Sequence, residues 1–201
     1  MKLLLVYGTT EGQTQKVAHF VHDHLARQGH QIRVFNAIDS DAEAAEPLEF
    51  DAVIIAASLH AGRYQAAIVD FVSKHVATIN ARPNAFLSVS LAAASDDEDD
   101  VQGLEQCVAN FTQQTGWVPQ RTHHVAGAFR YTSYDFLKRW AMKYIAYRKG
   151  APTDASRDHE LTDWADLAHF VETFSRSASA SIATQARPTA QAGDARMPPP
   201  G

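Results

Sequence analysis

Residues 5–14 read Leu-Val-Tyr-Gly-Thr-Thr-Glu-Gly-Gln-Thr, and this stretch decides the fold of the chain. It closes an apolar run that begins after Lys2, and such a run is typical of a strand buried on both faces of a parallel sheet. Beyond Gly12, apolar side chains recur at helical spacing as far as Gly29, where a helix is expected to end. These side chains are Val17, Phe20, Val21 and Leu25. The sequence therefore predicts a strand, a tight loop and a helix in direct succession.

The same alternation of strands and helices continues along the chain. Apolar runs predict strands near 32–35, 52–57, 85–90 and 122–126, and helical spacing predicts helices between the last three of these strands and over 162–174. Right-handed crossovers between such strands build an α/β fold with a doubly wound parallel sheet. Five strands favour the order 2-1-3-4-5.

Two segments depart from this minimal pattern. Residues 131–149 form an insertion between the fifth strand and the last helix, and residues 176–201 are rich in Ala, Ser, Pro and Gly. The second segment has too little large apolar surface to fold, so we expect it to be disordered. The sequence thus predicts one domain over residues 1–175, with a helical insertion at about 131–149, followed by a disordered tail.

The composition excludes several classes of function. The 201 residues are 45% hydrophobic and 20% charged, and the formal net charge is -5 with a pI near 6.0, whereas nucleic-acid-binding proteins are usually basic. Cys107 is the single cysteine, and no apolar run is long enough for a signal peptide or a membrane span, so we expect a cytoplasmic protein. His19, His22 and His24 have poor spacing for metal ligation, and we expect no metal site.

The loop after the first strand carries the clearest chemistry. Ligands of doubly wound sheets bind at the carboxyl ends of the strands, where loops begin at Gly8, Ser58, Leu91 and Gly127. A strand-to-helix turn supplies backbone N–H groups and the positive end of the helix dipole to a phosphate. The loop has neither the Gly-Lys-Ser/Thr ending of a nucleoside-triphosphate loop nor the three glycines of a dinucleotide site, so a monophosphate fits best. The alternative is a helix start capped by Thr and Glu or Gln, with no ligand.

This loop resembles the signature of the flavodoxin family, in which an apolar-aromatic strand end is followed by Ser or Thr, a small residue and a final Thr. Leu5, Val6, Tyr7, Thr9, Gly12 and Thr14 match each specified position. The resemblance implies a flavodoxin-like fold and flavin mononucleotide (FMN) as cofactor. The residues expected to hold its phosphate are Thr9, Thr10, Gly12, Gln13 and Thr14, and Glu11 of the same loop is expected to contact the cofactor.

Two further loops are expected to border the flavin ring. The first follows the third strand, and we expect its residues Ser58, Leu59, His60, Gly62 and Tyr64 to contact the ring by hydrogen bonds or packing. The alternative for this loop is a polar connection that caps the next helix. The loop after the fourth strand is expected to approach the other side of the ring with Ser90, Leu91 and Ala92.

Several strings carry a closer resemblance, to the bacterial quinone-dependent protoporphyrinogen dehydrogenases. They are Ala-Ser-Leu-His-Ala-Gly-Arg-Tyr at 57–64, Phe-Val-Ser-Lys-His at 71–75, Ala-Gly-Ala-Phe-Arg-Tyr at 126–131 and Thr-Asp-Trp at 162–164. The resemblance covers residues 1 to 175. It implies an enzyme of haem biosynthesis that oxidises protoporphyrinogen IX to protoporphyrin IX through FMN and passes the electrons to a membrane quinone.

The insertion is strongly basic. Between Arg130 and Lys149 it carries six basic residues against the single acid Asp135. At helical spacing, aromatic and aliphatic side chains gather on one face and basic side chains on the opposite face, which predicts a basic amphipathic helix. We expect it to contact anionic lipid at the cytoplasmic face of the inner membrane, or substrate propionates, with Arg130 and Tyr131 at the ring edge. The alternative is a helix packed on the core with a solvated face.

The acidic run at residues 96–100 keeps a second function open. It suits a solvated helix N-terminus, but a basic electron-transfer partner would also dock on it. A flavodoxin-like electron carrier without its own substrate is therefore the alternative to the enzyme, and a flavin-free interaction module is the third hypothesis.

Overall fold

The first strand carries the hydrophobic core on both of its faces. In the computed structural model, which describes residues 1–39, 46–129 and 159–185, β1 (Lys2–Gly8) lies at the centre of the sheet. Its Leu3 and Leu5 belong to one buried cluster, whereas Leu4 and Val6 belong to the cluster on the opposite face. Alternate side chains of a strand point to opposite faces, so an unbroken apolar run serves both clusters.

Five of the described strands form a parallel sheet in the order β2-β1-β3-β4-β5, which confirms the predicted order. The flanking strands are β2 (Gln31–Asn36), β3 (Ala52–Ser58), β4 (Asn84–Ser90) and β5 (Thr122–Ala126). Gly8 pairs in register with Ala57, Ser58 with Val89, and Ser90 with Ala126. Since these pairs stand at the ends of their strands, the loops that follow β1, β3, β4 and β5 leave from one edge of the sheet.

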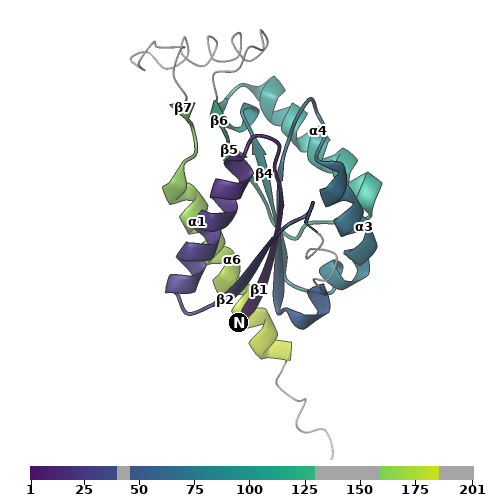
Figure 1. Cartoon of the computed structure of the whole chain (residues 1–201), viewed down its shortest axis with the longest axis vertical. Coiled ribbons are helices and arrows are strands. Elements are labelled where there is room, and N and C mark those ends of the chain that lie inside the picture. The colour runs from purple at the N-terminus through teal and green to yellow at the C-terminus, as the bar shows by residue number, and fades with distance from the viewer. Residues whose placement is uncertain (40–45, 130–158, 186–201) are drawn as a thin grey trace, which may run out of the picture.

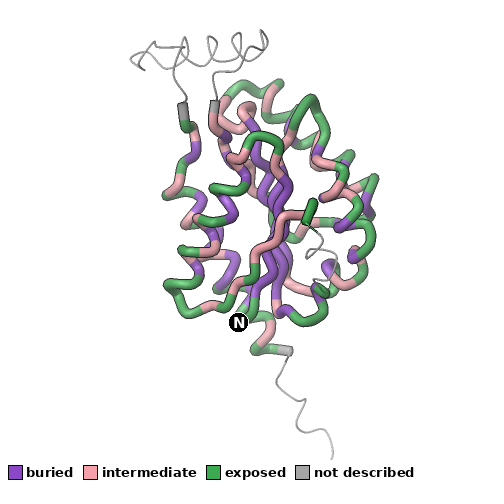
Figure 2. Tube along the Cα trace, in the orientation of Figure 1, coloured by how far each residue is buried: buried purple, intermediate pink, exposed green. Residues whose placement is uncertain are grey.

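Helices cover both faces of the sheet, as the alternation predicted (Figure 1). On one face lie α1 (Gln13–Arg27) and α6 (Trp164–Gln185), and on the other lie α3 (Ala66–Asn80) and α4 (Glu98–Thr115). Figure 2 shows the buried positions concentrated in the strands and on the inner sides of these helices. Short 3-10 helices, η1 (Pro47–Glu49) and η2 (Ala92–Ala94), follow β2 and β4 in the chain. No helix of the described ranges is both long enough and apolar enough to cross a membrane.

A two-stranded ladder that the sequence did not predict joins the two ends of the described chain around residues 130–158. It pairs β6 (Ala128–Phe129) with β7 (His159–Glu160) in antiparallel register, and Ala128 stands opposite Glu160. The predicted insertion at 131–149 and its amphipathic helix lie outside the described residues. The ladder nevertheless fixes where the chain leaves and rejoins the fold, directly beyond β5.

The last helix is longer than predicted. We expected helix over 162–174 and disorder from residue 176, which is wrong for residues 176–185, because α6 continues to Gln185. The small side chains of this stretch pack on an existing core instead of building one, and Ala178 is 2% exposed in the cluster that contains β1 and α1. Hydroxyl groups such as that of Ser177, which donates to the carbonyl of Phe174 at 2.8 Å, also find acceptors within the helix.

Truncation tests where the folded domain ends. A chain ending at Gln185 is expected to keep the melting temperature of the full chain, because α6 remains whole. A chain ending at Ser175 is expected to melt about 5 °C lower, because it loses the packing of Ala178 and the final turns of α6. Thermal unfolding followed by circular dichroism measures both, and equal melting temperatures for the two truncated chains would show that 176–185 adds nothing.

Candidate functional site

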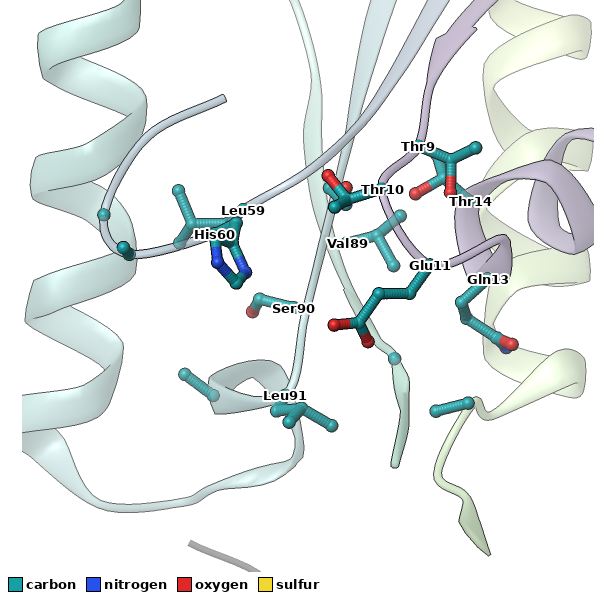
Figure 3. Close-up of a pocket in the computed structure, with 16 residues that line it drawn as sticks. Thr9, Thr10, Glu11, Gln13, Thr14, Leu59, His60, Val89, Ser90 and Leu91 are labelled. Atoms are coloured by element: carbon teal, nitrogen blue, oxygen red, sulfur yellow. The ribbon is translucent and has the colours of Figure 1, made fainter. Parts of the chain in front are cut away.

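A pocket of about 230 Å³ lies at the carboxyl edge of the sheet, where the sequence placed the ligand (Figure 3). It is bordered by the loops that follow β1, β3, β4 and β5 and by the end of β4 itself. Its lining consists of Thr9, Thr10, Glu11, Gln13, Thr14, Ser58, Leu59, His60, Ala61, Gly62, Val89, Ser90, Leu91, Ala92, Gly127 and Ala128. The structure therefore brings together nearly all of the residues expected to hold a cofactor.

The loop after β1 leaves the N-terminus of α1 open toward the pocket. Gly12 is the N-cap residue, with a positive φ of 87°, and no side chain caps the helix. The Thr9 hydroxyl accepts a hydrogen bond of 2.8 Å from the Gly12 N–H and so closes the turn. The capped helix start, the alternative to an anion site, is therefore not the arrangement found. The unpaired N–H groups of the first helical turn and the helix dipole make this loop a site for an anion.

Thr14 provides a direct test of whether a phosphate fits here. Its side chain is fully buried, and its Oγ1 has no hydrogen-bond partner among the described residues. A buried hydroxyl without a partner is unfavourable by about 1–3 kcal/mol, and a phosphate oxygen in the pocket would accept a hydrogen bond from it. The described lining contains no Lys or Arg, so what these residues offer an anion is the backbone N–H groups and the helix dipole. Thr14 and the loop thus fit a monoester phosphate.

Gln65, which the sequence analysis missed, links two of the pocket loops. Its Nε2 donates to Thr10 Oγ1 at 3.1 Å and to Ser58 Oγ. It lies beside Gly8, where an added Cβ would come within 2.6 Å of Ile68 Cγ1 and 3.1 Å of Gln65 Oε1. Because Gly8 has no side chain, the side chains of Gln65 and Ile68 can pack directly against the backbone there. Gln65 follows the expected loop directly, but nothing in its spacing marked it.

The loop after β3 turns back on itself through a two-residue turn. His60 and Arg63 exchange backbone hydrogen bonds of 2.9 and 3.0 Å, and the two residues between them have positive φ values. Those residues are Ala61, at 49°, and Gly62, at 77°, which is the geometry of a type I′ turn. The Leu59 N–H donates to the Val89 carbonyl at 2.8 Å and holds the loop against β4. Ser58, Leu59, His60 and Gly62 all border the pocket as expected, and Ala61 joins them.

Tyr64 is a residue that we expected at the flavin and that the structure does not bring to the pocket. Its ring lies in the core, 5.1 Å from the ring centroid of Phe86 and 5.0 Å from that of Phe111. Its hydroxyl shares a buried hydrogen bond of 2.8 Å with Ser88 Oγ. Burial raises the pKa of the Tyr64 phenol to about 12. Tyr64 anchors the loop to the sheet, and contact between its ring and a flavin would require it to leave the core.

The pocket is closed by the loops after β4 and β5. Ser90, Leu91 and Ala92 line it as expected, together with Val89. Gly127 and Ala128 form a further wall of the pocket. The sequence predicted a ligand-binding loop beginning at Gly127, but neither residue was named as a contact of the cofactor. The Gly127 N–H donates to the Ser90 carbonyl at 2.9 Å, so the two loops are joined.

The remaining predicted features are not part of the described lining of the pocket. Arg130, Tyr131 and the basic insertion fall outside the described residues. The acidic run forms the start of α4, where Asp97 is the N-cap residue and accepts a hydrogen bond from the Asp99 N–H. This arrangement agrees with the helix-terminus interpretation of the acids. Within the described ranges, no three His, Cys, Asp or Glu side chains lie close enough together to hold a metal ion.

Comparison with known proteins agrees with the fold. The flavodoxin domain family matches residues 4–156. The protoporphyrinogen IX dehydrogenase (quinone) of Escherichia coli K12 is 33% identical over 170 residues, which cover 85% of this chain and 92% of the relative. A protein of the same name from Leishmania major is 29% identical over 189 residues, covering 94% and 80% of the two chains.

Solved structures give the same topology at low sequence identity. The rubredoxin oxygen:oxidoreductase of Desulfovibrio gigas superposes with a TM-score of 0.53 and 12% identity, over 90% of this chain and 37% of that one. A short-chain flavodoxin associated with a bacterial microcompartment superposes with a TM-score of 0.51 and 13% identity, over 89% and 99%. At these identities the likeness shows the fold alone.

Two glycine substitutions are expected to change stability in opposite directions. Gly8→Ala is expected to lower the free energy of unfolding by about 2 kcal/mol, because the new methyl group would overlap Ile68, which is fully buried and cannot move aside. Gly103→Ala is the matched control, because Gly103 lies in α4 with nothing near its added methyl group. It is expected to raise stability by about 0.5–1 kcal/mol through helix propensity. Urea unfolding measures both, and equal effects would contradict the crowding at Gly8.

Proposed function

This chain belongs to the flavodoxin domain family, and from that premise we propose that it is an FMN-dependent enzyme that oxidises protoporphyrinogen IX and delivers the electrons to a quinone. The FMN cofactor follows from the family and from the fit of a monoester phosphate at Thr14. The substrate and the acceptor rest on the relatives, which share one name and align over most of their length. The observation that carries the proposal is the unpartnered, buried Thr14 hydroxyl at the open start of α1, inside a chain that these relatives match nearly end to end.

In this proposal the loop after β1 holds the FMN phosphate. The donors proposed for it are the backbone N–H groups of Thr10, Glu11, Gln13 and Thr14 and the hydroxyls of Thr10 and Thr14, since the Gly12 N–H is bound to Thr9. Glu11 contributes its N–H only: its exposed side chain lines the pocket, and its carboxylate has to turn away from a bound phosphate, because like charges repel. Gly12 takes part through its left-handed backbone, which turns the chain around the anion.

The two middle loops border the flavin ring. Ser58, Leu59, His60 and Gly62 lie on one side, and Ser90, Leu91 and Ala92 lie on the other. When bound, FMN supplies the two-electron oxidation that no protein side chain performs. The chain's own contribution is to hold the ring between these loops, to exclude water with Leu59 and Leu91, and to present polar groups of Ser58 and Ser90 to its edge. Tyr64 anchors the loop after β3 to β4 by its hydrogen bond to Ser88.

A flavodoxin-like electron carrier without its own substrate is the second candidate. The exposed acids at the start of α4 favour it, because they lie in the segment that follows the Ser90–Ala92 loop and would attract a basic partner. The same exposed acids are explained by helix capping, which is why the enzyme remains the main proposal.

An anaerobic assay separates the two candidates. The purified chain is expected to be yellow or to become yellow with FMN, and with protoporphyrinogen IX and a quinone it is expected to produce porphyrin fluorescence well above the uncatalysed rate. A Thr14→Val variant, which removes the unpartnered hydroxyl at nearly constant volume, is expected to bind FMN at least tenfold more weakly. Flavin binding without porphyrin formation would leave the carrier, and no flavin binding would remove both candidates.

The basic insertion is proposed to bring the substrate and quinone to the flavin, through Arg130, Tyr131 and the charged residues up to Lys149. Replacing 131–149 by a short Gly-Ser linker is expected to leave FMN bound while quinone-dependent turnover falls at least tenfold, since cationic and aromatic side chains suit propionates and an anionic lipid surface. Removing 186–201 is the matched control and is expected to change neither property. Co-sedimentation with anionic vesicles measures the membrane contact. Unchanged turnover after the replacement would exclude a functional insertion.

A further inference from the structure

Gln13 has both of its amide protons engaged away from the proposed phosphate position. Its Nε2 donates to Thr162 Oγ1 at 2.9 Å and to Glu160 Oε1 at 3.0 Å. The Thr162 hydroxyl donates in turn to the Ala126 carbonyl at 2.6 Å, so toward Gln13 it can only accept. Both partners of the Gln13 amide are thus acceptors, which assigns Nε2 to this side and leaves the carbonyl oxygen on the other. Figure 3 shows the Gln13 side chain leaving the loop on the side away from Leu59 and His60.

The partners of Gln13 lie next to the loop after β5, whose residues Gly127 and Ala128 form one wall of the pocket. Thr162 is 9% exposed, and beside it the Leu161 N–H donates to the Gly127 carbonyl at 3.1 Å. Gly127 is buried, and its N–H is bound to the Ser90 carbonyl. An added Cβ on Gly127 would already lie 3.5 Å from the Ser90 carbonyl carbon, so the wall is in close contact with the end of β4. One chain of hydrogen bonds therefore runs from the phosphate loop through Thr162 to the pocket wall.

We propose that Gln13 is a positioning residue and not a phosphate ligand: its side chain ties the phosphate loop to Thr162 and thereby holds the Gly127–Ala128 wall against the flavin ring. This inference rests on the proposed FMN function and adds a role for Gln13 and Thr162 within it. Thr162 does not line the pocket, so its hydroxyl acts on the flavin only through its partners, the Gln13 amide and the Ala126 carbonyl that precedes the wall.

Comparison of FMN with riboflavin distinguishes a wall tie from a phosphate ligand, because riboflavin lacks only the phosphate. Gln13→Met in the full-length chain is expected to weaken FMN and riboflavin binding by the same factor, about fivefold, since the wall borders the ring that both ligands share. Thr162→Val is expected to do the same, although every residue of the phosphate loop is retained. The double variant is expected to bind no more weakly than the weaker single variant, because both substitutions break one connection.

Two control variants accompany these measurements. Gln15→Met changes an exposed glutamine of the same helix and is expected to leave both affinities unchanged. Thr162→Ser keeps the hydroxyl and is expected to restore wild-type affinities. Flavin fluorescence titration gives the dissociation constants, and the visible spectrum of bound FMN is expected to change in Gln13→Met and Thr162→Val but not in the controls.

The outcomes that overturn the inference are distinct from those that overturn the proposed function. A loss of FMN affinity with unchanged riboflavin affinity in Gln13→Met would identify Gln13 as a phosphate ligand. A lower melting temperature with unchanged affinities and spectrum would reduce the tie to a structural contact. Failure of the wild-type chain to bind either flavin would overturn the proposed function, and this inference with it.

Discussion

Burial of β1 on both faces is the constraint on which the rest of the structure depends. A strand with Leu3 and Leu5 in one cluster and Leu4 and Val6 in the other has no face left for polar side chains, so polar chemistry must lie at its ends. Parallel pairing in register brings the ends of β3, β4 and β5 to the same edge. The packing of the core therefore sets the position of the pocket, and the residues of the loops set its chemistry.

Hydrogen bonds between side chains and between backbone groups connect the loops at this edge. Gln65 connects the loop after β1 to the loop after β3, and the Gly127 N–H connects the loop after β5 to the end of β4. Gln13 and Thr162 join the first loop to the last. Small residues make these approaches possible, because a side chain at Gly8 would displace Ile68. The result is a pocket whose walls depend on one another, with Thr14 as the buried hydroxyl left for a ligand.

Features set by local burial were predicted from the sequence, whereas contacts between distant residues were not. The sheet order and the presence of the helices that cover the described sheet were predicted correctly, because hydrophobic periodicity reflects burial directly. Tyr64 was expected at the flavin, but an aromatic residue next to a functional loop is equally typical of a core. Its ring packs in the core, and its hydroxyl is hydrogen-bonded to Ser88. The end of α6 was misjudged because Ala and Ser look like tail residues until a neighbouring core offers them a surface. Gln65 went unnoticed because a single amide carries no periodic or motif signal.

By itself, the sequence determined the α/β class, the strand order, the edge that carries the site and the monophosphate character of the first loop, since each of these depends on local patterns of hydrophobicity, glycine and hydroxyl residues. Only the tertiary structure decided which side chains face the pocket, that Tyr64 belongs to the core and that Gln13 reaches Thr162. Those contacts join residues far apart in the chain, and Gln13 and Thr162 are 149 positions apart. Long-range pairing depends on how whole elements pack, and no local pattern of residues records it.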